Sequence, residues 1–295
     1  MPKGKSAFFR VDREERLSAA LETLESKGVV RNASATELYA KLKRLGSVVE
    51  AGTYSVAPGM SASALLASLR KPIVESVYLP GWWISRIAAK LEKRQICSAA
   101  DYIALASKPD AFKGQVSFVL PKDSLEGYLY PATYNLEPMC GAKTVILKQL
   151  QAFQRNVASR LPPKTDLHRA LTIGSLIQAE VKNDSERPLV ARVIENRLEH
   201  KIPLEFDTSV LYALGTWRVL KPNEVHTIAS PYNTYLHDGL PPGPICSPAW
   251  PSVEAALKPA SATYLYFVAK SDGSLLFATS YQDHLRNIRI IRKPA

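Results

Sequence analysis

The sequence predicts an α+β protein in which small strand-helix-helix units precede a larger mixed α+β domain. A strand followed by two short helices occurs twice near the N-terminus, and three longer helical patterns are later followed by a strand-turn-strand pattern. We place the first unit at residues 1–72, the second at 73–114 and the larger domain at 115–295. A chain of 295 residues with 46% hydrophobic residues is long and apolar enough to bury a sizeable core.

The first unit begins with the strand FFRV and a helix that ends near Gly28. The apolar residues of this helix share one face: Leu17, Ala20, Leu21 and Leu24. Asn32 is suited to cap the second helix. Residues 50–71 then supply a strand, a turn at Pro58-Gly59 and a further helix, which we expect to close the unit.

The second unit repeats this order, with Ser98 as the cap of its second helix. Its first helix carries apolar residues in the matching places: Ile84, Ile87, Ala88 and Leu91. Both units resemble the LysM-like fold, a small module associated with aminosugar polymers. The resemblance implies glycan binding, while the residues equally allow two packed units that bind no sugar.

The larger domain opens at Val116 with a segment rich in aromatic, proline and glycine residues, which we interpret as a strand with tight turns. Helical periodicity predicts helices over about 142–160, 166–181 and 186–200. Beyond Pro203 the chain is rich in loops. The turn at Asp272-Gly273 between two aromatic-rich runs predicts a terminal β-hairpin.

The composition limits the partners and cofactors of the chain. A formal net charge of +11 favours polyanions, but the basic residues are dispersed and no RNA- or DNA-binding motif is present, so we expect no nucleic-acid partner. Three cysteines without a CxxC pair imply no disulfide framework, and five histidines without ligand spacing give no support for a metal site. We expect no cofactor.

The helix that contains Glu180 is the segment most informative about chemistry. Ile173, Leu176 and Ile177 lie on the same helical face as Glu180, so its carboxyl group emerges from an apolar stripe. Poor solvation disfavours the charged form and raises the pKa toward the range of a proton donor at neutral pH. Cleavage of a glycosidic bond requires such a donor, because the leaving oxygen must be protonated.

This helix alone also allows a structural role, in which Glu180 ends the helix or pairs with Lys182 or Arg187. An ordered set of motifs surrounds it: LEGYLYPATY, GSLIQAEV, ERPLVARVIENRL, LEFDTSVLYALG, SPYNTYLHDGLPPGPI and YLYFVAKSDGSLLFATSYQDHLRNI. This set resembles the YceG-like (MltG) family of endolytic peptidoglycan lytic transglycosylases. The resemblance is good from about residue 70 to 295 and weaker before it.

The resemblance implies an enzyme that cleaves the MurNAc-β-1,4-GlcNAc bond of peptidoglycan without water, leaves 1,6-anhydroMurNAc ends and terminates nascent strands. One glutamate then serves as acid and base, and it falls on Glu180. The family commonly has a second glutamate two residues earlier, where this chain has Gln178. On a helix these two positions face different sides, so we take Glu180 as the acid. The alternative, suggested by Gln178 and the LysM-like units, is a non-catalytic glycan-binding or scaffold protein of the same ancestry.

The motifs also supply the predicted substrate-binding residues: Glu126, Tyr128, Glu205, Asp207, Ser230, Tyr232, Asn233, Thr234 and Tyr235. Glu126 is either a second cleft carboxylate or the cap of a turn. Asp207 either caps a helix or binds sugar hydroxyls. Where Glu205 stands, the family usually has glutamine. The loop 230–235 combines aromatic, amide and hydroxyl groups, the mixture that sugar recognition uses.

The location of the protein is inferred from the resemblance alone. It implies the inner membrane, facing the periplasm or cell exterior, with glycan strands as substrate and peptidoglycan synthases as candidate partners. Members of the family are typically tethered by an N-terminal membrane helix. The chain as given has neither the ~18 consecutive apolar residues of such a helix nor a signal peptide.

Overall fold

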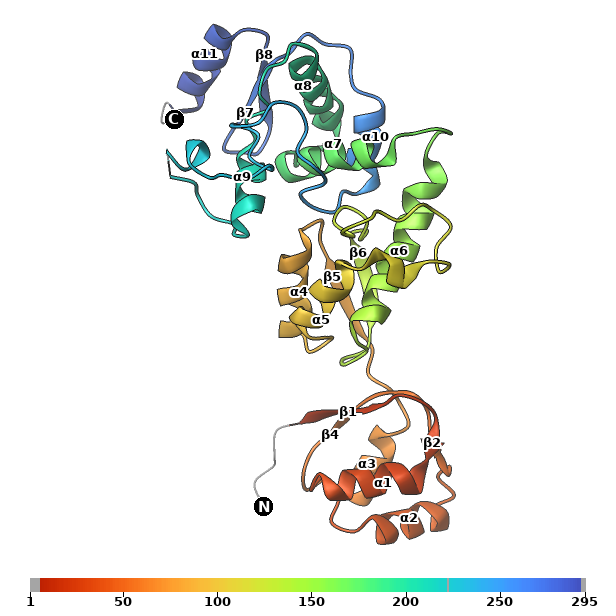
Figure 1. Cartoon of the computed structure of the whole chain (residues 1–295). Helices are drawn as coiled ribbons and strands as arrows, with labels where there is room; N and C mark the ends of the chain where they lie inside the picture. The colour runs from red at the N-terminus through yellow and green to blue at the C-terminus, as the bar shows by residue number, and fades with distance from the viewer. Residues whose placement is uncertain (1–5, 222, 293–295) are drawn as a thin grey trace. The chain divides into compact units, whose positions relative to one another are not determined.

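The computed structural model describes residues 6–221 and 223–292 (Figure 1). It combines helices with short two-stranded sheets and confirms the predicted α+β class. The chain divides into two compact units. The first contains the described residues up to Tyr78 with Ala89–Tyr102 and Thr133–Val145, and the second contains Leu79–Ala88, Ile103–Ala132 and the described residues from Ile146 onward. The predicted boundaries after residues 72 and 114 stay a prediction.

The first unit starts with strand, helix, helix and strand in the predicted order. Its elements are β1 (Ala7–Val11), β2 (Glu15–Arg16), α1 (Leu17–Ser26), α2 (Ala33–Leu42), β3 (Val48–Val49), β4 (Gly52–Val56) and α3 (Ala62–Ser68). β1 pairs antiparallel with β4, and β2 with β3. The side chain of Asn32 accepts the Ala35 N–H at 2.7 Å, so the predicted cap of α2 is confirmed.

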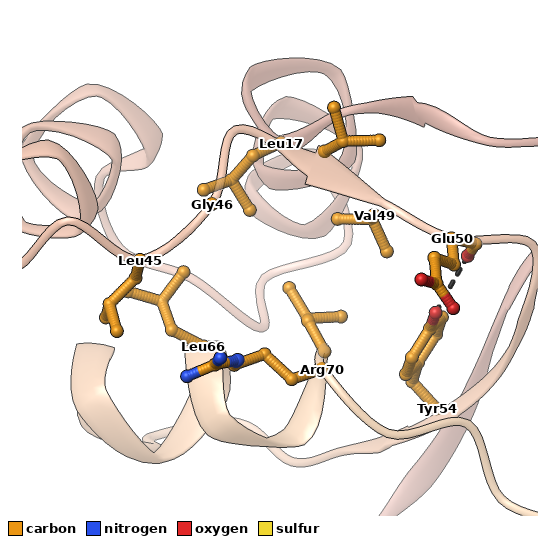
Figure 2. A pocket seen from close by; sticks show the side chains of 10 residues that line it. Leu17, Leu45, Gly46, Val49, Glu50, Tyr54, Leu66 and Arg70 are labelled. Carbon is orange, nitrogen blue, oxygen red and sulfur yellow. Dashed lines mark hydrogen bonds between the residues drawn. The ribbon is translucent and has the colours of Figure 1, made fainter.

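Helices α1, α2 and α3 and the β1–β4 pair enclose the core of this unit. All four predicted apolar positions of α1 are buried: Leu17, Ala20, Leu21 and Leu24. A pocket of about 270 Å³ opens beside this core, between Leu17, Leu66 and the segment 45–50 (Figure 2). Arg70 adds a guanidinium to its lining, and the Tyr54 hydroxyl donates to the Glu50 carbonyl at 2.7 Å. The LysM-like relationship and glycan binding by these units stay predictions.

The second strand-helix-helix pattern is also present. It consists of β5 (Glu75–Leu79), α4 (Ile84–Lys93) and α5 (Ala99–Ala106), and β5 pairs with β6 (Ala132–Leu136). The Ser98 hydroxyl accepts the Asp101 N–H at 3.3 Å, as expected of a cap at the start of α5. The division into units passes through α4, because Ile84 belongs to the second unit and Lys93 to the first.

The predicted helices of the larger domain are present with small shifts at their ends. They are α6 (Ala142–Asn156), α7 (Leu167–Glu180) and α8 (Arg187–Glu199), followed by α9 (Asp207–Leu214), α10 (Trp250–Leu257) and α11 (Tyr281–Arg292). Short 3₁₀ turns lie at Pro109–Phe112, Ala158–Arg160, Asp184–Glu186 and Glu224–His226. The terminal hairpin is confirmed, with β7 (Tyr266–Ala269) antiparallel to β8 (Leu275–Ala278).

The predicted strand with tight turns after Val116 is confirmed: residues 116–130 form turns and loops, and the strand β6 follows at Ala132–Leu136. Gly127 adopts a φ of +87°, and a Cβ there would lie 2.5 Å from Cγ of Pro244. A left-handed residue packed this closely against a proline cannot continue a strand.

Helix α7 lies at the centre of the second unit. It packs against α8, α9 and α10, and all its residues from Ala170 to Ile177 are buried. The Asp166 side chain caps its start by accepting the Arg169 N–H at 3.0 Å. Helix α11 packs against both strands of the terminal hairpin. The buried part of α7 therefore fixes the position of its last turn, which carries Glu180.

Candidate active site

Glu180 is the last residue of α7 and is half-buried. Its Oε1 accepts a hydrogen bond of 2.6 Å from the hydroxyl of Thr208, the second residue of α9. The first N–H groups of a helix have no partner within the helix, and the helix dipole favours negative charge at this end. The N-terminus of α9 therefore stabilises the ionised form of Glu180.

Burial nevertheless raises the pKa of Glu180 to about 7. The hydroxyl and the backbone N–H of Thr208 act in the opposite direction, because they bind the charged form, while the negative charge of Asp207 raises the pKa further. With a pKa near neutrality, Glu180 can release a proton and take one up at physiological pH.

Gln178 has a different environment from Glu180. Its Oε1 accepts the backbone N–H of Ala249 and the hydroxyl of Ser252, both at 3.0 Å, so it faces the start of α10. The expectation that positions 178 and 180 face different sides is confirmed. Neither structural pairing considered for Glu180 occurs among the described residues: Arg187 donates to Asp184 and Ser252 instead, and Lys182 forms no ion pair with Glu180.

The structure places Asp207, Glu205 and Tyr235 near Glu180. The Tyr235 hydroxyl donates to Oδ1 of Asp207 at 2.7 Å. Burial, this hydrogen bond and the charges of Asp207, Glu205 and Glu180 together raise the pKa of Tyr235. Asp207 and Glu205 are exposed. Helix α9 has Phe206 at its N-cap position with no side-chain cap, so the alternative in which Asp207 caps this helix is wrong.

Glu205 is held by one contact of its side chain and one of its backbone. Its carboxylate accepts a hydrogen bond from Nη1 of Arg197 at 3.1 Å, and its N–H donates to the Thr234 carbonyl at 3.0 Å. Its φ of +55° is uncommon for a residue with a side chain. Arg197 also donates to the carbonyls of Pro203 and Leu204, so this arginine holds the segment that leads into α9.

The loop 230–235 divides into buried and accessible residues. Asn233 is fully buried and donates to two carbonyls of its own region, at 2.9 Å each. The Thr234 hydroxyl is buried, accepts the Phe206 N–H at 2.9 Å and hydrogen-bonds the Ser209 hydroxyl. Ser230 accepts a backbone N–H two residues ahead. Thr234 holds the loop onto the start of α9 and Asn233 and Ser230 hold its own shape, whereas Tyr232 and Tyr235 remain partly accessible.

Glu126 lines a separate pocket of the second unit, with a volume of about 560 Å³. Its Oε2 accepts the N–H of Ile84, the first residue of α4, at 3.0 Å, and its buried Oε1 has no hydrogen-bond partner in the described structure. Burial raises the pKa of Glu126 to about 8. Tyr128, Tyr212 and Tyr232 line the same pocket. Glu126 thus lies in a pocket and also accepts a backbone N–H at the start of α4, so both alternatives for its role stay open.

Tyr128 packs mainly inside the second unit. It is 4% exposed, and its ring lies 5.3 Å from that of Phe153 and 6.2 Å from that of Phe118. The rings of Tyr212 and Tyr232 lie 4.8 Å apart. Thr208 and Tyr212 were not among the residues singled out from the sequence. A sequence signal could have found them: Thr208 directly follows Asp207, and Tyr212 lies four residues later, on the same face of the same helix.

No helix within residues 6–221 and 223–292 has both the length and the hydropathy to cross a bilayer. Over the same residues, no three His, Cys, Asp or Glu side chains are grouped so as to hold a metal ion. Cys97, Cys140 and Cys246 are free thiols.

Comparisons with known proteins agree with the motif order. A model of the YceG-like family matches residues 9–290. The chain is 33% identical to the endolytic murein transglycosylase of Bacillus subtilis, over 91% of this chain and 80% of that protein. It is 30% identical to the endolytic murein transglycosylase of Streptococcus pneumoniae over 90% of its own length, but it spans only 55% of that protein.

A crystal structure of a YceG-like protein from Listeria monocytogenes superposes with a TM-score of 0.64 at 29% identity, over 96% of this chain and 99% of that one. The shared fold therefore extends over both compact units. This chain belongs to the YceG-like family.

Proposed function

We propose that this protein is an endolytic lytic transglycosylase of peptidoglycan, in which Glu180 is the catalytic acid and base. The observation that carries the proposal is a carboxyl group with a pKa of about 7, bound by Thr208 at the N-terminus of α9. The relatives named endolytic murein transglycosylase supply the substrate class.

In the proposed reaction, protonated Glu180 gives its proton to the oxygen of the MurNAc-β-1,4-GlcNAc bond while the C1–O bond breaks. The carboxylate that results is stabilised by Thr208 and by the helix dipole. It then takes the proton of the muramoyl C6 hydroxyl, whose oxygen bonds to C1 and closes the 1,6-anhydro ring. No water is consumed, and Glu180 is protonated again at the end.

The exposed groups around Glu180 form the proposed sugar-binding surface. Glu205, Asp207 and the Asp207-bound hydroxyl of Tyr235 offer acceptors and a ring edge beside the acid. Ser230, Asn233 and Thr234 act on substrate indirectly, because their polar groups hold the loop that carries Tyr232 and Tyr235. Glu126, Tyr128 and Tyr232 line the neighbouring pocket, and we assign them to substrate contact there.

The substrate fixes the proposed location. Glycan strands are extracytoplasmic, so the described chain acts at the cell wall, where terminating new strands would bring it close to peptidoglycan synthases. A net charge of +11 suits an anionic polymer surface.

The proposal is tested by incubating the purified protein with polymeric peptidoglycan and analysing the products by mass spectrometry. We expect fragments with 1,6-anhydroMurNAc ends, and none with Glu180→Gln. Glu199→Gln is a matched control, because Glu199 is the last residue of α8 as Glu180 is of α7, but it is exposed. Reducing muramic ends would show a hydrolase and overturn the mechanism. Strand binding without any cleavage would instead support the non-catalytic alternative.

A further inference from the structure

Three tryptophans of the second unit surround one arginine. The guanidinium of Arg86 lies 3.7 Å from the ring centroid of Trp82, 5.4 Å from that of Trp217 and 5.8 Å from that of Trp83. The rings of Trp83 and Trp217 are 5.8 Å apart. We call these four residues the tryptophan–arginine cluster. Trp82 and Trp83 directly precede α4, and Trp217 follows α9, so the tertiary structure brings them together.

The cluster has the properties of a binding surface. Trp217 is 51% exposed, an unusual fraction for a tryptophan in a folded protein. Arg86 is half-buried, and within the described structure its guanidinium forms no ion pair and no hydrogen bond. Burial lowers the pKa of Arg86, but guanidinium remains charged at neutral pH. Cation–π contacts do not occupy the N–H donors of a guanidinium with hydrogen-bond acceptors, so these donors remain available to a ligand.

One helix joins this cluster to the proposed active site. Trp83 contacts Tyr212 edge to face, with ring centroids 6.1 Å apart. Tyr212 lies four residues after Thr208 on α9, and such positions are neighbours on a helix surface, about 6 Å apart. Thr208 binds Glu180. Contacts of Thr208, Tyr212 and Trp83 along α9 therefore link Glu180 to the tryptophan–arginine cluster, so both sites are positioned by the same helix.

We propose that the tryptophan–arginine cluster is a substrate subsite, in which Trp217 stacks against a sugar ring and Arg86 binds a carboxylate of the peptide carried by the strand. The inference rests on the proposed function. Sugar rings present apolar faces to aromatic side chains, and guanidinium binds carboxylates in a bidentate manner. Arg86 has no acidic partner among residues 6–221 and 223–292, so an acidic group on the substrate would complete its contacts. The subsite thus distinguishes peptide-bearing strands from bare ones.

The test compares Arg86→Gln, Arg86→Lys and Trp217→Ala on two substrates, peptidoglycan strands with their peptides and the same strands after the peptides are removed. For Arg86→Gln we expect KM to rise about tenfold on peptide-bearing strands only, with kcat unchanged. Arg86→Lys should recover only part of the loss, because ammonium cannot bind in a bidentate manner. Trp217→Ala should raise KM on both substrates. Arg155→Gln, an exposed arginine on α6, is the control.

An equal effect of Arg86→Gln on both substrates, or no effect, overturns the inference while cleavage by the unaltered protein still supports the proposed function. If the unaltered protein cleaves neither substrate, the proposed function fails. The subsite is then tested by co-sedimentation with the two kinds of strand, where selective loss of binding to peptide-bearing strands by Arg86→Gln supports it and unchanged binding overturns it. Near-UV circular dichroism checks that each variant is folded.

Discussion

Two carboxyl groups of the second unit, Glu180 and Glu126, are both raised in pKa by burial, to about 7 and about 8. Their surroundings differ. Glu180 is half-buried and accepts a hydrogen bond from the hydroxyl of Thr208. Glu126 is only 7% exposed, accepts a backbone N–H on one oxygen and has no partner on the other within the described structure.

The comparison teaches that a raised pKa alone does not make a carboxyl group a catalyst. A group that gives up a proton and regains it must also be stabilised while ionised. Glu180 has a hydroxyl and a helix N-terminus that stabilise its ionised form, and its side chain is partly accessible. Glu126 is more deeply buried and its ionised form is less well stabilised, so we expect it to act as a neutral donor or a structural group.

The largest expected effect separates the two glutamates directly. Glu180→Gln should lower kcat by ~10³-fold or more, because general acid–base catalysis is lost. Glu126→Gln should retain activity within about tenfold, because an amide resembles the protonated carboxyl group in shape and can still donate. Initial rates of anhydro-end formation measure both. Equal losses in the two variants would contradict the assigned roles.

The next effect concerns Thr208. Thr208→Val removes a hydrogen bond to the ionised form, so the pKa of Glu180 should rise above about 7. The basic limb of the kcat/KM profile should then move to higher pH, because Glu180 stays protonated to a higher pH. The maximal rate should fall about tenfold, because the carboxylate is less well stabilised. Thr208→Ser keeps the hydroxyl and serves as control. A lowered maximal rate without a shifted profile would assign Thr208 to structure alone.

The third effect is the contribution of Glu126 to the pH dependence of the free energy of unfolding. The folded protein holds the Glu126 proton up to about pH 8, whereas the unfolded chain releases it near pH 4.5. The folded state therefore binds more protons between these values, and the free energy of unfolding falls as pH rises through this window. At about 1.4 kcal/mol per unit of pKa shift, the loss is several kcal/mol.

Glu126→Gln should remove this loss, so that the variant gains stability relative to the unaltered protein as pH rises. Urea unfolding at pH 5 and pH 9 measures the difference. Parallel pH dependences for the two proteins would mean that Glu126 is ionised at little cost.

The smallest effect is expected from Asp207→Asn. Removing the negative charge near Glu180 should lower the pKa of Glu180, and the basic limb of the profile should move slightly to lower pH, opposite to Thr208→Val. The amide oxygen can still accept the Tyr235 hydroxyl, so the loop geometry is preserved. A shift to higher pH would show that the charge of Asp207 does not act on Glu180.

Structural features that depend on residues close together in the chain could be predicted from the sequence. Periodicity identified the buried face of α1, and the Asp272-Gly273 turn identified the hairpin of β7 and β8. Apolar spacing placed Glu180 on a buried face at the end of α7. A helix or a tight turn repeats a local geometry, so its pattern is visible in the order of residues.

The sequence did not distinguish residues that bind a ligand from residues that hold a loop. Asn233 and Thr234 have the composition of a sugar-binding loop, yet both are buried and hydrogen-bonded within the protein. Polar and aromatic residues satisfy their hydrogen bonds in either role, and only the path of the chain decides which groups remain exposed.

The sequence by itself therefore determined the α+β class, the repeated strand-helix-helix pattern and the apolar surroundings of one glutamate. The tertiary structure alone decided that Thr208 binds Glu180, that Gln178 faces α10 and that Arg86 lies among three tryptophans. Apart from those of Arg86 with Trp82 and Trp83, these contacts join residues far apart in the chain, and their formation depends on how helices pack, which no local spacing encodes.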